Sequence, residues 1–277
     1  MGEDGLPPDL YQPNVSANPA PIPILVYHQI SEAPPKGAPF RGLYVSPAAF
    51  ARQMALLKML GYKALSMTDL QPYLKGEKQG KVVGITFDDG YLNNLTNALL
   101  VLQKHGFTST CYVVDGLLGK TNVWDEGIGI AQTSLMTADQ LLQWQAGGQE
   151  VGAHTQDHVD LLSVSEIAAW KQIATSKTTL QTLLGKPVSH FCYPYGKFDE
   201  RHSTMAKQAS YETATTTVRS RVHAATNMLR LPRVPVMRST SLPVFWLKIA
   251  TAYEDTKSQD AKTQEAKSKY AKSKDSA

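Results

Sequence analysis

Short apolar segments rich in β-branched residues alternate with longer amphipathic or polar segments along the chain. Apolar segments of this length, bounded by turn residues, predict buried β-strands. They cover residues 23–27, 82–87, 108–114, 150–153 and 189–193, with two less regular ones at 211–216 and 229–236. Because predicted strands and helices alternate about seven times, we expect an α/β fold with a parallel sheet. Its simplest form is a (β/α) barrel, a distorted or incomplete seven-stranded one.

Helix start and stop residues lie between these strands. Ser46 before a proline, and the pairs Thr137 with Gln140 and Ser163 with Glu166, are typical of helix N-termini. Glycines such as Gly61, Gly106 and Gly185 follow helical segments and are typical of helix ends. The predicted helices cover residues 47–60, 92–105, 137–146 and 164–184.

The ends of the chain differ in composition from its centre. Residues 1–21 are rich in proline and asparagine, which predicts an extended arm. Beyond Trp246 apolar residues become rare, and we expect a Lys-rich, solvated tail over residues 251–277. Residues 22–250 then form one globular domain. Inside it, the loop of about 20 residues after residue 114 is longer than most connections, and such loops are often functional.

The charge distribution argues against nucleic-acid binding. The net charge is +4, but residues 256–277 hold six lysines and three acidic residues and therefore carry +3 of it. A nearly neutral globular part lacks the basic surface that nucleic acid requires. No apolar run reaches the length of a membrane span.

The cysteines and the N-terminal residues are relevant to the cellular location of the protein. Cys111 and Cys192 both fall in predicted strands, and we expect two buried free thiols. The first residues lack the basic and apolar regions of a signal peptide. We expect either an extracytoplasmic protein, periplasmic or secreted, whose leader is absent from this sequence, or a cytoplasmic protein if the N-terminus is native.

Polar residues follow several of the predicted strands where they end. His28 follows the first strand, Asp88 and Asp89 follow the second, and His154 and His158 follow the fourth. The carboxyl ends of parallel strands meet on one face of a barrel, where active sites lie. Taken alone, the two aspartates are equally typical of a helix N-cap. The spacing of the histidines would place both rings on one side of a helical turn, as a single metal ion requires.

Three motifs in this order resemble those of the polysaccharide deacetylase family, carbohydrate esterase family 4. They are TFDDG at 86–90, HTQDHVDL at 154–161 and FCYPYG at 191–196. The resemblance, which spans about residues 22–240, implies that Asp88 is the general base. It implies that Asp89, His154 and His158 bind the metal, and that the backbone N–H of Tyr195 lies where the oxyanion forms.

The chain departs from the family pattern in two places. Cys192 stands where the third motif usually has an arginine, and LPRVPV at 231–236 replaces a final Leu-x-His. Together with VYHQI at 26–30, both departures resemble the branch that de-N-acetylates poly-β-1,6-N-acetylglucosamine. This branch implies that His28 is the general acid and makes Arg233 a candidate for orienting Asp88. The alternative for His28 is a hydrogen-bonded histidine at a strand end, and the alternative for Arg233 is a surface ion pair.

We therefore expect a metal-dependent hydrolase that removes N-acetyl groups from a bacterial polysaccharide, either poly-β-1,6-N-acetylglucosamine or peptidoglycan. The expected cofactor is one zinc ion, with cobalt, nickel or iron as alternatives. Tyr193 and Trp124 are candidates for stacking on sugar rings, although Trp124 is equally typical of loop packing. Two other hypotheses remain open: an amidohydrolase acting on small amides and an inactive sugar-binding relative.

Overall fold

Seven parallel strands close into a barrel in the computed structural model, which describes residues 20–255. The strand order is β1-β10-β9-β8-β7-β6-β5, and β5 pairs again with β1 to close the circle. This confirms the predicted (β/α) barrel and shows that it is closed, with a register shift between β9 and β10. The strands are β1 (Ile24–Tyr27), β5 (Val82–Phe87), β6 (Thr110–Val113), β7 (Glu150–Ala153), β8 (His190–Cys192), β9 (Thr213–Arg219) and β10 (Leu231–Pro235).

Three shorter strands were not predicted. Strand β4 (Lys63–Leu65) pairs with the first half of β5, on the edge that β6 occupies further along. Strands β2 (Gln29–Ile30) and β3 (Tyr44–Val45) form a separate parallel pair beside the C-terminal end of β1. Each has only two or three residues, so no alternation could identify them.

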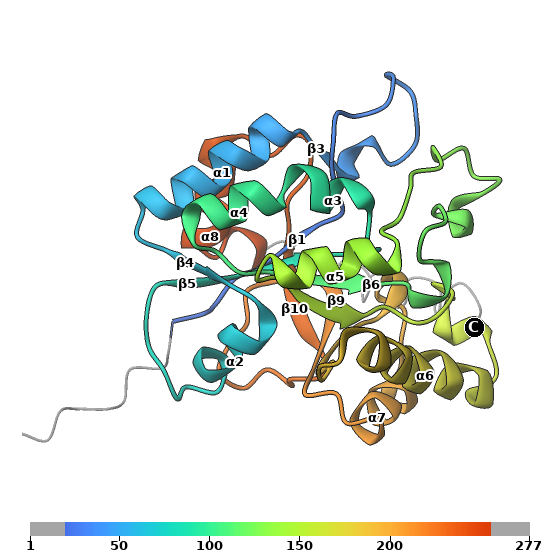
Figure 1. Ribbon diagram of the computed structural model, residues 1–277. Helices are drawn as coiled ribbons and strands as arrows, with labels where there is room; N and C mark the ends of the chain where they lie inside the picture. Colours follow the sequence, from blue (N-terminus) through green and yellow to red (C-terminus); the bar gives the residue numbers. More distant parts are fainter. Residues whose placement is uncertain (1–19, 256–277) are drawn as a thin grey trace, which may run out of the picture.

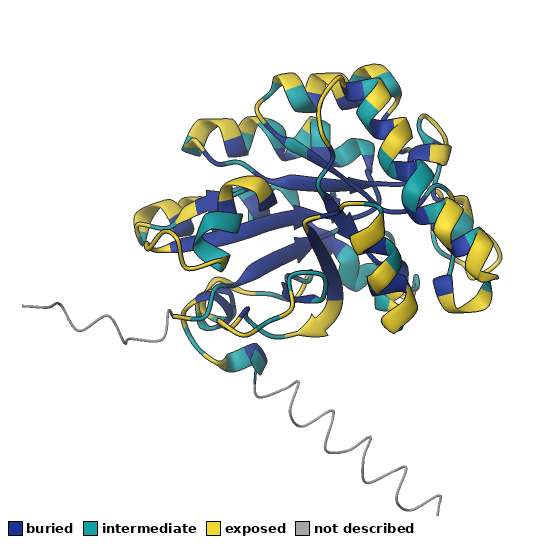
Figure 2. Ribbon diagram, turned by 90° about the horizontal axis from the view of Figure 1, so that it is seen from below, coloured by how far each residue is buried: buried dark blue, intermediate teal, exposed yellow. Residues whose placement is uncertain are grey.

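Helices surround the barrel, as Figures 1 and 2 show, with their exposed faces outward and the buried strands at the centre. They are α1 (Pro47–Met59), α2 (Met67–Leu74), α3 (Leu92–Asn97), α4 (Leu99–His105), α5 (Ala138–Ala146), α6 (Glu166–Leu184), α7 (Glu200–Gln208) and α8 (Leu242–Ala250). Five 3-10 segments lie in the connections: η1 (Arg41–Leu43), η2 (Asp115–Leu117), η3 (Val123–Asp125), η4 (Leu161–Ser163) and η5 (Pro194–Gly196).

Two of the predicted helices differ in detail. The helix predicted over 92–105 is divided into α3 and α4 at Ala98, although its N–H still donates to the Asn94 carbonyl. The helix predicted to begin after Ser163 begins after Ser165, whose hydroxyl accepts from the Ala168 N–H. The earlier prediction was wrong because Val164 is extended, so the helix cannot start before it.

The predicted ends of the domain are only partly described. Most of the predicted arm (residues 1–21) and tail (residues 251–277) lies outside the described residues. Helix α8 continues to Ala250, where the predicted domain ends, and its Ile249 is buried. Lys248 is also buried and is paired with Glu254.

Alternate residues of β5 face the helices and the inside of the barrel. One face packs into the main apolar core under the helices: Val83, Ile85 and Phe87. The other face starts with Val82, in a smaller apolar cluster. Gly84 follows, where a Cβ would lie only 2.8 Å from the Leu70 side chain. Thr86 and Asp88 continue this face, so the alternation of the strand itself directs Asp88 inward.

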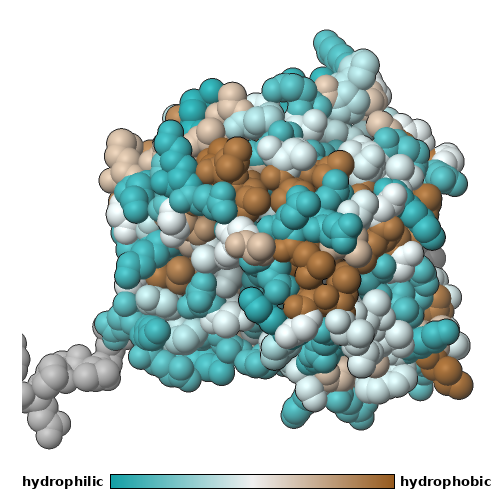
Figure 3. Space-filling model, viewed as in Figure 1, coloured by the Kyte–Doolittle hydropathy of each residue, from teal (hydrophilic) through white to brown (hydrophobic). Residues whose placement is uncertain are grey.

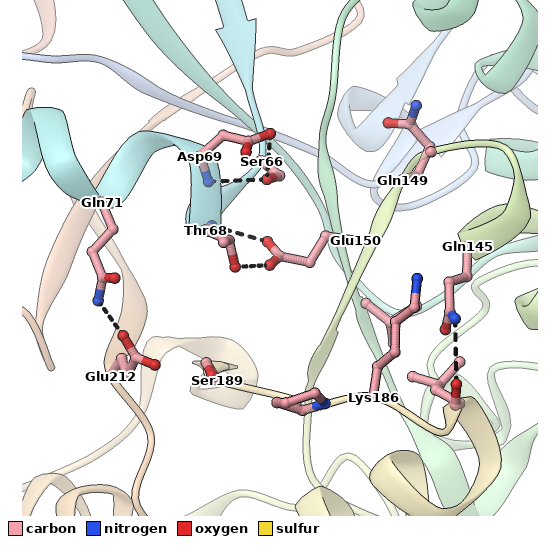
Figure 4. A pocket seen from close by; sticks show the side chains of 14 residues that line it. Ser66, Thr68, Asp69, Gln71, Gln145, Gln149, Glu150, Lys186, Ser189 and Glu212 are labelled. Atoms are coloured by element: carbon pink, nitrogen blue, oxygen red, sulfur yellow. Dashed lines mark hydrogen bonds between the residues drawn. The ribbon is translucent and has the colours of Figure 1, made fainter.

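A polar cavity of about 530 Å³ lies at the N-terminal end of the barrel (Figure 4). There Glu150, at the start of β7, accepts the backbone N–H groups of Met67 and Thr68 at the start of α2. At one side of the cavity Gln71 donates to Glu212 at 2.7 Å. These hydrogen bonds connect α2 to the starts of β7 and β9, and they close the N-terminal end of the barrel.

The surface carries scattered apolar side chains rather than one long apolar element. On the face shown in Figure 3 they gather in patches separated by hydrophilic side chains. Among residues 20–255, no helix has both the length and the apolar character needed to span a bilayer.

Asp115, the first residue of η2, generates a prediction about stability. Its side chain is buried, and burial raises its pKa to about 6. Between about pH 4 and pH 6 the unfolded chain therefore loses this proton before the folded one, and stability falls as pH rises. We expect Asp115→Asn to raise the free energy of unfolding by about 1–3 kcal/mol near pH 8 and much less near pH 4.

Urea unfolding at the two pH values would measure the difference. Glu77→Gln is the matched control, because Glu77 is exposed and its charge is solvated in both states. Equal effects of Asp115→Asn at both pH values would contradict the account.

Candidate active site

A cavity of about 170 Å³ opens at the C-terminal end of the barrel strands, where the sequence predicts the site. The structure brings the predicted residues together there. The cavity is lined by His28, Asp88, Asp89, Trp124, His154, His158, Tyr193 and Tyr195, while Arg233 lies buried below Asp88. His28 and Tyr195, which are 167 positions apart in the sequence, thus converge on one space.

Asp89, His154 and His158 form a compact set of metal-competent groups. Their ligand atoms all lie within 4.8 Å of one another, and all three residues are buried. Nε2 of His154 lies 3.5 Å, and Nε2 of His158 3.4 Å, from Oδ1 of Asp89. The Nδ1–H of His154 donates to the Cys192 carbonyl at 2.7 Å, which directs Nε2 at the Asp89 carboxylate. A ring nitrogen and a carboxylate oxygen at this distance need a proton or a cation between them, and three such groups around one point fit a divalent ion.

The two histidines converge through an irregular loop and not through a helical turn. Thr155 and His158 both have positive φ, 64° and 55°, so the predicted helical arrangement is wrong. The side chain of Gln172 on α6 holds the loop: its Oε1 accepts the N–H groups of Gln156 and Asp157, both at 3.0 Å. Its amide also donates to the Asp157 carboxylate. The positive φ values create the bend, and Gln172 satisfies the backbone that the bend exposes.

Aromatic rings enclose His158 from two sides. The Trp124 ring stacks on it with centroids 4.4 Å apart, and the Tyr195 ring meets it edge-on at 4.5 Å. Trp124 thus packs against a metal-competent residue as well as lining the cavity. Tyr193 lies deeper, with its ring buried against Phe198 and its hydroxyl donating to the Leu229 carbonyl.

Asp88 has a very different environment from its neighbour Asp89. Arg233 holds both of its carboxylate oxygens, at 2.6 and 2.7 Å, and both residues are almost fully buried. Burial raises the pKa of Asp88, but the Arg233 guanidinium outweighs burial and holds that pKa below its usual value. Burial also acts on Asp89, and hydrogen bonding to His154 and His158 holds its pKa well below the usual value.

All five N–H groups of Arg233 have partners. Besides the two that bind Asp88, the others donate to the Thr216 carbonyl, the Thr86 hydroxyl and the Cys192 sulfur. The guanidinium is therefore fixed in position and presents a bidentate surface to the carboxylate. A surface ion pair, the alternative considered for Arg233, is wrong because only 1% of this residue is exposed.

His28 lies on the other side of Asp88, directly after β1. Its Nε2 is 3.9 Å from Oδ2 of Asp88, and about a quarter of its side chain is exposed to the cavity mouth. Cys192 lies beside the same carboxylate, and both cysteines are free and buried, as predicted. Asp88 thus has an arginine beneath it, a histidine beside it and open space above it.

The polysaccharide deacetylase family matches residues 75–214, just over half of the chain. The chain belongs to this family. YxkH of Bacillus subtilis, which is named as a polysaccharide deacetylase, is 28% identical over 229 residues, covering 82% of this chain and 75% of that protein.

Two solved structures are similar to this chain over most of its length. The deacetylase PplD of Streptococcus pyogenes, in complex with acetate, has a TM-score of 0.74 at 26% identity, covering 83% of this chain and 99% of that one. IcaB from Ammonifex degensii has a TM-score of 0.70 at 26% identity, covering 83% and 97%. The likeness to these two structures therefore extends over most of the described chain.

Two residues in or beside the candidate site were not predicted from the sequence. Gln172 lies within a helix and belongs to no motif, so only the fold shows that it meets the metal-competent loop. Asp125 lines the cavity from the long connection after β6. The length of this connection predicts a functional loop, but it does not identify which residue reaches the site.

The hydrogen bonds of Gln172 lead to a prediction about metal affinity. We expect Gln172→Met to weaken metal binding by about 10-fold or more, because groups that orient metal ligands typically contribute 10–100-fold to affinity. Competition with a chromophoric zinc chelator measures the dissociation constant. Lys171→Met is the control, since Lys171 is exposed on the same helix. An unchanged affinity in Gln172→Met would show that the loop needs no such support.

Proposed function

We propose that this member of the polysaccharide deacetylase family is a divalent-metal-dependent hydrolase that removes N-acetyl groups from N-acetylglucosamine units of a bacterial polysaccharide. The observation that carries the proposal is the division of roles between two adjacent aspartates. Asp88 is held in its ionised form by Arg233, whereas Asp89 faces two histidines. One carboxylate can then accept a proton while the other binds a cation.

Asp89, His154 and His158 are the proposed ligands. Two histidines and one carboxylate leave positions open for water and substrate, which is typical of a catalytic site. When bound, the ion supplies Lewis acidity toward the acetamide carbonyl and makes water in the site more acidic. Zinc is the proposed ion, and the same donor set also suits cobalt, nickel and iron.

The proposed proton transfers involve Asp88 and His28. Asp88 takes the proton of the attacking water, because its carboxylate is ionised and opens onto the cavity. His28 borders the same cavity and donates a proton to the departing amine. The backbone N–H of Tyr195 stabilises the developing oxyanion, for which one well-placed donor contributes about 3–4 kcal/mol.

The proposed substrates are poly-β-1,6-N-acetylglucosamine and, as the second candidate, peptidoglycan. The position of His28 beside Asp88 and of Arg233 beneath it supports the first, since both features belong to the branch that the sequence resembles. Acetate, the expected product, occupies the similar deacetylase PplD. Such substrates imply an extracytoplasmic location, which is part of the proposal.

Acetate release before and after chelation tests the proposal. Oligomers of β-1,6-linked and β-1,4-linked N-acetylglucosamine and peptidoglycan are compared side by side. We expect chelator-sensitive release from one of them, restored by the metal. A protein that binds metal stoichiometrically but releases no acetate from any would favour the small-amide alternative, and one without metal or activity would favour the sugar-binding one.

Asp88→Asn and Asp89→Asn separate the two proposed roles. We expect Asp88→Asn to lower kcat by about 10²–10⁴-fold, as general bases contribute, with metal content unchanged. Asp89→Asn lowers metal content as well. Elemental analysis of both variants beside their kcat values gives the answer, and equal loss of metal in the two would reverse the assignment.

Arg233→Lys tests the control of Asp88. A lysine cannot hold both carboxylate oxygens, so the pKa of Asp88 rises and the acidic limb of the pH–rate profile moves to higher pH. We expect a loss of kcat of about 10-fold or more, because a bidentate charged contact is replaced by a single one. The profile of kcat/KM between pH 4 and pH 9 would show the shift; an acidic limb that stays in place would contradict the account.

A further inference from the structure

Three carboxylates line the cavity, and two of them are already engaged. Asp88 is held by Arg233, and Asp89 faces His154 and His158. The third, Asp125, has one oxygen bound by the Asn122 side chain at 2.7 Å. Among the residues described, no other side chain donates to it. Asp125 is half-buried and lines the cavity, so its second oxygen can accept a hydrogen bond from a ligand bound there.

The loop that carries Asp125 is built to hold it in place. Asn122 is fully buried at its centre, and its Oδ1 accepts the Thr133 N–H at 2.6 Å. Its backbone carbonyl accepts from the Gln132 side chain at 3.2 Å and from the Asp125 N–H at 3.0 Å. The two ends of the loop are joined by a bridge between Thr121 and Ser134. These contacts fix the direction of the Asp125 side chain before any ligand arrives.

Asp125 lies near the reacting groups without belonging to them. Its neighbour Trp124 stacks on His158, which fixes the loop against the metal-competent residues. The carboxylate is close enough to Asp89, His158 and His28 to interact with them electrostatically. It is not among the groups whose ligand atoms cluster within 4.8 Å, so it is not a further metal ligand.

Apolar side chains line part of the cavity: Phe40, Leu43, Ile128 and Ile130. Gln29, Tyr44, Tyr91 and Thr217 complete its lining. A sugar unit brings several hydroxyl groups into this space, and each loses a water partner on entry. A hydroxyl that donates to an ionised carboxylate forms one of the stronger kinds of hydrogen bond.

We propose that Asp125 is a substrate-binding residue whose free carboxylate oxygen accepts a hydrogen bond from a ring hydroxyl of the sugar that carries the scissile acetamido group. This inference rests on the proposed function and adds to it a residue that selects sugars over other acetyl compounds. If Asp125 only stabilised the turn, asparagine could replace it, because the amide oxygen would still accept from Asn122. A carboxylate is needed at this position only if a hydrogen-bond donor of the substrate binds to it in the cavity.

Asp125→Asn tests the inference on two substrates. One is an N-acetylglucosamine oligomer, and the other is 4-nitrophenyl acetate, an acetyl ester without hydroxyl groups. We expect kcat/KM on the oligomer to fall about 10–100-fold, mainly through KM, because the amide presents a donor to the hydroxyl. Hydrolysis of the ester changes by less than about threefold, since the ester has no hydroxyl to bind.

Glu126→Gln is the matched control, because it removes the same charge from an exposed neighbour in the same loop. It leaves both activities close to those of the unsubstituted protein. Equal losses on both substrates in Asp125→Asn, a loss of metal, or no loss on the oligomer would overturn the inference. If the unsubstituted protein hydrolyses the ester but releases no acetate from the oligomer, the proposed function fails first, and the inference fails with it.

Discussion

The buried contact between Arg233 and Asp88 is the interaction on which the rest of the site depends. It joins β10 to the end of β5 across β1, inside the closed barrel. An ionised carboxylate without a partner would be very costly at this depth, and the guanidinium lowers that cost while leaving the carboxylate open to the cavity. Both oxygens of Asp88 are engaged by Arg233, so of the two aspartates Asp89 is the one with a carboxylate free for a metal ion. Asp89, whose φ of 75° turns it away from the strand, is left to face the histidines.

The barrel brings the functional side chains to one rim, and the loops at that rim set their orientations. Strands β1, β5, β7 and β8 end at the same rim, which brings His28, the two aspartates, His154 and Tyr193 to one cavity. Unusual backbone conformations then direct the side chains, since several rim residues have positive φ: Asp89, Thr155, His158 and Tyr195. Gly196, the next residue, packs so closely against Thr217 that a Cβ would not fit. Non-glycine residues in this conformation carry strain that surrounding contacts must offset, and such strain is concentrated at functional sites.

The sequence predicts the barrel and the residues at the ends of its strands because both follow from apolar segments and from motifs beside them. It does not predict the loop that holds His158, because the spacing of the histidines is equally compatible with a helical turn. Gln172 holds a loop 15 or 16 positions away in the chain, and Asp125 lines a cavity formed by residues distant from it in the sequence. Nothing in their local sequence distinguishes them from other glutamines and aspartates. For Arg233 the resemblance suggested a role beside Asp88, but the burial that makes the contact strong is a property of the closed barrel.

The most direct test of the central claim, that the two aspartates divide base and metal ligand between them, is a crystal structure of the protein with zinc, measured above and below the zinc absorption edge. The account predicts one anomalous peak about 2.0–2.2 Å from Asp89 and from Nε2 of both His154 and His158, the distances that zinc makes with carboxylate oxygen and imidazole nitrogen. Asp88 would remain on Arg233 and outside bonding distance of the ion. A peak coordinated by Asp88, or no peak between these residues at saturating zinc, would contradict it.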